Sequence, residues 1–99
     1  MFKNWRISRR MKRAAIWWKN HLKTIETAIR LTNGNEYEAL KWRLIEREIT
    51  MWIGLDKQIE ASEFRAVCYC RGFSYEQKQL LKNALIYIGI GKHLNGDDV

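Results

Sequence analysis

The chain of 99 residues contains no proline. Proline ends helices, because it lacks the amide hydrogen and its ring clashes with the preceding turn. Its absence, together with only six glycines, favours long uninterrupted helices. The length and an apolar fraction of 46% suit one folded domain with a modest core. The sequence therefore predicts an all-α domain.

Turn-forming residues divide the chain into four predicted helices. Residues 32–35 form a turn, and Gly54 and Asp56 mark a second boundary, with Asp56 as the N-cap of the next helix. Ser74 followed by Gln77 is a capping-box pattern that marks a third. We expect a small bundle over residues 1–94 and a fraying polar tail over residues 95–99. The helices are predicted near residues 8–31, 36–53, 57–71 and 75–91.

Apolar periodicity predicts which helix faces are buried. The first helix carries one stripe centred on Trp18, with apolar residues at steps of three and four. The second helix carries two stripes on opposite sides, so it is predicted to be the central helix of the bundle. The stripe of the first helix comprises Met11, Ala15, Trp18, Leu22, Ile25 and Ile29. Those of the second comprise Tyr37, Leu40, Leu44 and Met51, and Trp42, Ile45, Ile49 and Ile53.

The charge of the chain is concentrated at its N-terminus. The first 25 residues carry eight lysines and arginines and no acid. The other ten lysines and arginines face all eleven aspartates and glutamates, so residues 26–99 are close to neutral. The net charge of +7 therefore belongs to the N-terminal segment of the chain. Such segregation of charge points to a binding partner and says little about the fold.

Placed on a helix, these cations form a face opposite the predicted core. If Trp18 points inward, Arg9 points about 180° away, and the other cations flank it. Ile16 falls in the middle of this face, Trp17 on its border facing outward, and Trp5 beside Lys12. The predicted binding surface comprises Arg6, Arg9, Arg10, Lys12, Arg13, Ile16, Trp17, Lys19 and Lys23.

Cations with interleaved aromatic residues are typical of nucleic-acid-binding surfaces, because they neutralise phosphates and stack on unpaired bases. The leading hypothesis is a non-enzymatic, nucleic-acid-associated accessory or regulatory protein that binds DNA or RNA. The alternative is a protein-directed inhibitor or adaptor, of the kind that phages and other mobile elements encode. It would dock its basic face on an acidic surface of a larger protein or nucleoprotein complex. The plainest interpretation is a solvated basic face without a partner.

A role at a membrane surface or as a mitochondrial presequence fits the first helix less well. Binding to an anionic membrane surface would expose the apolar stripe that the core needs. A mitochondrial presequence is also basic and poor in acids, but it is usually rich in serine. No apolar run approaches the roughly 18 residues of a membrane span, so we expect no transmembrane segment. Two cysteines do not make a disulfide-stabilised secreted domain, which favours an intracellular, cytoplasmic protein.

No pattern in the sequence supports an enzyme, a cofactor or a metal centre. Cys68 and Cys70 are two residues apart and therefore diverge on a helix, so they are interpreted as small buried apolar side chains. Glu46 and Glu48 diverge in the same way, which is unsuitable for paired acid–base catalysis.

The last two predicted helices offer two further hypotheses. The turn within residues 71–77 resembles that of a helix-turn-helix, but Lys78 stands where that motif needs an inward apolar residue. We interpret it as an ordinary helix–helix corner. Ile86 and Ile90 form an apolar pair on the side that also carries Lys82, which predicts an interface. Homo-oligomerisation and binding to a larger partner fit this pair equally well.

Overall fold

The computed structural model describes residues 2–96, and the side chains of residues 4–96. Its helices are α1 (Phe2–Arg30), α2 (Glu36–Gly54), α3 (Ala61–Arg71), α4 (Tyr75–Ile88) and the short 3₁₀ helix η1 (Lys92–Leu94). No strand occurs within residues 2–96, so the predicted all-α bundle is confirmed. Residues 97–99 of the predicted tail lie outside the described part.

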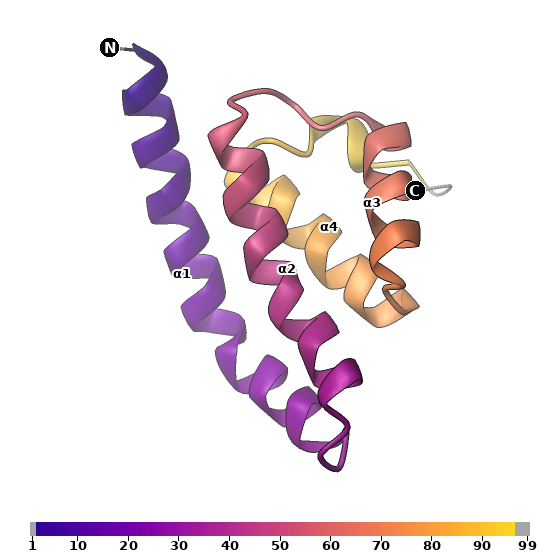
Figure 1. Ribbon diagram of the computed structural model, residues 1–99. Helices are drawn as coiled ribbons and strands as arrows, with labels where there is room; N and C mark the ends of the chain where they lie inside the picture. The colour runs from indigo at the N-terminus through magenta and orange to yellow at the C-terminus, as the bar shows by residue number, and fades with distance from the viewer. Residues whose placement is uncertain (1, 97–99) are drawn as a thin grey trace.

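Helices α1 and α2 form an antiparallel hairpin, and α4 packs against both of them (Figure 1). Helix α3 lies on the far side of α4 from α1 (Figure 1). The side chains of α4 that point into the bundle, Leu81, Ala84, Leu85 and Ile88, are fully buried. One face of helix α4 is therefore enclosed by the rest of the bundle.

Local capping explains most of the helix boundaries. The Asn35 side chain accepts from the amide of Glu38 at 3.1 Å, and Ser74 and Gln77 form the predicted capping box. Helix α3 instead begins at Ala61, because Glu60 and Glu63 form a capping box that the sequence analysis missed. The prediction that Asp56 caps α3 is wrong. Helix α1 begins at Phe2 rather than near residue 8, since nothing in its first turns stops a helix.

The prediction that α2 is sandwiched between other helices is wrong. Its stripe of Ile45, Ile49 and Ile53 is buried, with exposed fractions of 3% or less. The opposite stripe is open to solvent, and Leu40 and Met51 are 49% and 47% exposed. The core needs only one face of α2, because α1 and α4 already enclose that face from two sides.

Helix α1 turns a different side to the core from the one predicted. Trp17 and Ile25 are buried, at 3% and 1% exposed, whereas Met11 and Leu22 of the predicted stripe are 39% and 38% exposed. The buried line is rotated by about 60° from the predicted centre. Trp18 is half-buried and packs against the edge of the core. This rotation decides which cations of α1 remain free.

The C-terminal segment folds back into the bundle. Helix α4 ends at Ile88, because Gly89 adopts a left-handed backbone conformation (φ 99°) and the Ile90 amide donates to the Leu85 carbonyl at 3.0 Å. The Ile90 carbonyl in turn accepts from the amide of Ile59 at 2.9 Å. Ile90 is fully buried and Ile86 packs against the core.

The predicted exposed pair of Ile86 and Ile90 therefore does not exist. A helix continuing to residue 91 would have kept both residues on one outward face, but α4 stops before Ile90. Lys82, the cation assigned to the same interface, lies half-buried on α4.

One buried ion pair connects α2 with α3. Arg71 Nε donates to Glu48 Oε1 at 2.7 Å, and the Glu48 side chain is 2% exposed. The second carboxylate oxygen of Glu48 has no hydrogen-bond partner within the described residues. Because the Arg71 cation compensates this buried carboxylate, Glu48 adds little negative charge to the outer face of α2.

Candidate functional site

The cations of α1 divide into an inward set and an outward set. The inward set is the one that contacts the rest of the fold. Arg6, whose side chain is 49% exposed, and Arg10, at 17%, share the carboxylate of Asp56, which follows α2. Arg6 Nη2 and Nε donate to its two oxygens at 2.7 and 3.2 Å, and Arg10 Nη1 donates at 2.9 Å. The hydrogen bond with Asp56 raises the pKa of Arg6. These contacts tie the start of α1 to the end of α2.

Arg13 belongs to the inward set as well. Its Nη1 lies beside Gly89, at the carboxyl end of α4, where an added Cβ atom would come within 3.4 Å. The carboxyl end of a helix carries partial negative charge and favours a cation. Arg6, Arg10 and Arg13 therefore contribute to the fold, whereas the sequence pattern predicted that they bind a partner. Together with Trp5, Arg9, Ile88 and Gly89 they line a hollow of about 250 Å³.

The outward set forms one exposed line along α1. It contains four cations, Arg9, Lys12, Lys19 and Lys23. All four are exposed, and none forms an ion pair with a described side chain. Spacings of three and four residues keep the whole line on one side of the helix over about 27 Å. Apolar residues interrupt it, since Ile16 is 51% exposed and Trp5 is 61% exposed. The name cationic stripe is used below for Trp5, Arg9, Lys12, Ile16, Lys19 and Lys23.

The exposed aromatic residue of this surface is Trp5, and the prediction that Trp17 faces outward is wrong. The buried Trp17 ring stacks on His21, with 4.1 Å between the ring centroids. In contrast, the Arg9 guanidinium carbon lies 5.5 Å from the centroid of the exposed Trp5 ring. A cation beside an exposed indole ring combines the two contacts that single-stranded nucleic acids use.

A second surface, which the sequence patterns did not predict, is a groove between α1 and α2. This α1–α2 groove has a volume of about 370 Å³. It is lined by Met11, Ala14, Ala15, Trp18, Lys19 and Leu22 of α1 and by Glu46, Ile49 and Thr50 of α2. The rotation of α1 opens it, because four of these residues belong to the stripe that was predicted to be buried.

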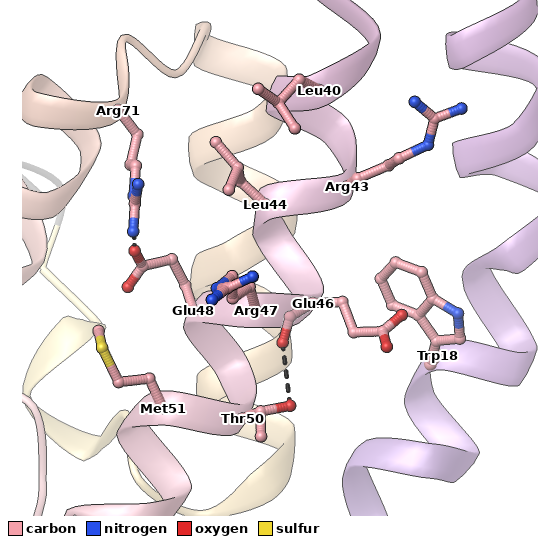
Figure 2. A pocket seen from close by; sticks show the side chains of 10 residues that line it. All are labelled: Trp18, Leu40, Arg43, Leu44, Glu46, Arg47, Glu48, Thr50, Met51 and Arg71. Carbon is pink, nitrogen blue, oxygen red and sulfur yellow. Dashed lines mark hydrogen bonds and ion pairs between the residues drawn. The ribbon is translucent and has the colours of Figure 1, made fainter.

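A shallow hollow over α2 continues this groove. It shares Trp18, Glu46 and Thr50 with the groove and extends to Leu40, Leu44 and Met51. Figure 2 shows Arg47 between its two sides, with Glu46 and Trp18 on one side and Glu48 and Arg71 on the other. Helical periodicity predicted the second stripe of α2, but it could not show that this stripe stays uncovered.

The described residues form no cluster of the kind that binds a metal ion. No group of three or more His, Cys, Asp or Glu side chains there could hold a metal ion. Cys68 is buried and Cys70 is exposed, so of the two cysteines only Cys68 is the buried residue that was predicted. Burial raises the pKa of the Cys68 thiol to about 11, which opposes formation of the reactive thiolate.

Comparisons with protein-family models, curated proteins and solved structures found no match to the chain. Within the described residues, none of the helices has the length and apolar character needed to cross a membrane.

Proposed function

We propose that the protein is a nucleic-acid-associated accessory or regulatory protein that contacts phosphates through the cationic stripe. The observation that carries the proposal is the set of four exposed cations on one helix face without ion-pair partners among the described residues. Cations that stabilise a fold are usually paired or lie at helix ends, as Arg6, Arg10 and Arg13 do.

The stripe can neutralise several phosphates without rearrangement of the protein. Arg9 and Lys12 lie in consecutive turns, and Lys19 and Lys23 follow about 10 Å further along the helix. All of them point to the same side, which suits a ligand that lies along α1. Trp5 at one end provides an apolar ring for stacking on an unpaired base. The proposal concerns contacts with phosphates, which fix the position of a protein on a nucleic acid and are the same for every base sequence.

Salt dependence of binding tests the proposal. Four phosphate contacts predict a slope of log K against log salt of about −3.6 for duplex DNA. The affinity should then fall about 150-fold between about 50 and 200 mM salt. Fluorescence anisotropy with labelled 20-nucleotide DNA duplexes, single-stranded DNA and RNA measures this slope.

Paired variants locate the contacts. Lys12→Ala with Lys23→Ala should halve the slope, to about −1.8, because two of four phosphate contacts are lost. The matched control is Arg65→Ala with Lys92→Ala, which removes the same charge from exposed positions on α3 and η1. An equal loss of affinity in both variants would show that net charge alone drives binding. That result, or no binding at 50 mM salt, refutes the proposal.

Trp5 has a separate role that a further variant isolates. Trp5→Ala should weaken binding to single strands by about 1–3 kcal/mol and leave duplex binding nearly unchanged. Trp5 is 61% exposed, so removal of its ring does not open the core.

A further inference from the structure

The α1–α2 groove and the adjoining hollow expose more apolar surface than the fold requires. Met11 and Leu22 at the two ends of the groove are 39% and 38% exposed, and Leu40 and Met51 of the hollow are 49% and 47% exposed. Single exposed apolar residues are normal, but a contiguous patch beside polar residues marks a surface that contacts another molecule. Trp18, shared by the groove and the hollow, makes these surfaces continuous.

The shape of the groove fits a helix. It runs along α1 from Met11 to Leu22, about 16 Å, which equals three helical turns. Its walls are two antiparallel helices, α1 and α2, so a third helix would complete a packing layer (Figure 1). An amphipathic helix of about 11 residues would place apolar side chains at i, i+3 or i+4, and i+7 into such a groove.

The charge around the groove selects an acidic occupant. Lys19 lines it on the α1 side, and Arg43 and Arg47 line the adjoining hollow on the α2 side. Figure 2 shows Arg43 extending toward α1 and Arg47 projecting from α2. None of these three cations forms an ion pair with a described side chain.

The acids of this region compensate only part of that charge. Glu46 is exposed and opposes the cations, whereas buried Glu48 is already paired with Arg71. We infer that the α1–α2 groove binds an acidic amphipathic helix of a partner protein. A second copy of this chain is a poorer occupant, because a symmetric contact would bring Lys19, Arg43 and Arg47 of both copies together.

This inference goes beyond the proposed function and uses a different side of α1. The groove and the cationic stripe share only Lys19. Variants outside Lys19 therefore separate the two: Ala15 lies in the groove, and Lys23 lies in the stripe. A protein with both surfaces would hold an acidic protein beside a nucleic acid.

The test uses a synthetic probe. A fluorescein-labelled 18-residue helical peptide carries leucine at alternating steps of three and four and glutamate at the flanking positions. A matched peptide carries lysine in place of glutamate. We expect anisotropy titration to show that the acidic peptide binds at least about tenfold more tightly than the basic one.

Two surface variants place the probe in the groove. Ala15→Glu adds an acid at an exposed groove position and should weaken acidic-peptide binding at least about tenfold. Its control, Asn20→Glu, adds the same charge at an exposed position about 140° away around α1 and should have little effect. Replacing both Arg43 and Arg47 with glutamate should reverse the order of affinities, so that the basic peptide binds more tightly than the acidic one.

Several outcomes would overturn the inference. These are equal binding of the two peptides, equal effects of Ala15→Glu and Asn20→Glu, or no binding of either peptide. A concentration-dependent dimer in light scattering that Ala15→Glu dissociates would assign the groove to a second copy. Lys23→Ala should weaken only oligonucleotide binding, so failure of either proposal is recognised separately.

Discussion

The exposed side of α1 can be tested with two matched substitutions. Leu22 and Ile25 belong to the same apolar stripe in the sequence, but Leu22 is 38% exposed in the groove and Ile25 is 1% exposed in the core. Leu22→Ala and Ile25→Ala each remove three carbon atoms and leave the same residue. Any difference between them therefore reports the environment of the side chain and not the size of the deletion.

The structure gives the expected size of that difference. Removing three buried methyl or methylene groups costs about 2.4 kcal/mol in transfer free energy. At Ile25 a cavity is added, which raises the loss above this value, to as much as about 5 kcal/mol. At Leu22, the 62% of the side chain that is buried reduces the transfer term to about 1.5 kcal/mol. No cavity is added there, because the groove is open to water. Ile25→Ala should therefore cost at least about 1 kcal/mol more than Leu22→Ala.

Urea unfolding followed by circular dichroism and tryptophan fluorescence measures both free energies. The slope against urea should be the same in both variants, because the unfolded chains expose similar surface. For a domain of this size, the expected difference corresponds to about 4–8 °C or more in Tm. Equal losses, or a larger loss for Leu22→Ala, would show that Leu22 is as deeply covered as Ile25. The assigned rotation of α1, and the groove that depends on it, would then be wrong.

Three further predictions concern other parts of the fold. Asp56→Asn removes the carboxylate but keeps a residue type that tolerates the positive φ of 53°. The free energy of unfolding in urea should fall by about 2 kcal/mol. A loss under about 0.5 kcal/mol would contradict the shared ion pair. Gly91→Ala would place a Cβ atom 2.8 Å from the α4 backbone and should lower Tm, whereas Gly54→Ala meets no atom within 4 Å and should leave Tm unchanged or raise it. Burial raises the pKa of the Cys68 thiol from 9.0 to about 11, because it disfavours the thiolate. The stability that this shift contributes is complete below pH 9 and is lost as the pH rises through about 11. Cys68→Ala should remove that part of the alkaline destabilisation in pH-dependent unfolding, and exposed Cys70→Ala should not.

Local chemistry in the sequence determined the helices and their starting points. The capping residues Asn35 and Ser74 act within one turn of their own helices, so their patterns predict the starts of α2 and α4 correctly. The start of α3 was missed because Glu60 is a less common capping residue, whose partner Glu63 reveals it only in the capping-box geometry.

The sequence by itself also located the excess charge on the first helix, since that depends only on counting residues. The tertiary structure decided which of these cations lack ion-pair partners and face solvent. Trp17 and Trp18 are equally apolar neighbours, and periodicity cannot choose between two lines about 60° apart on a helix. The choice depends on α4 and on Asp56, which lies 46 residues beyond Arg10. Contacts over that separation turn Trp17 and Arg10 inward, and they leave the cationic stripe and the α1–α2 groove exposed to solvent.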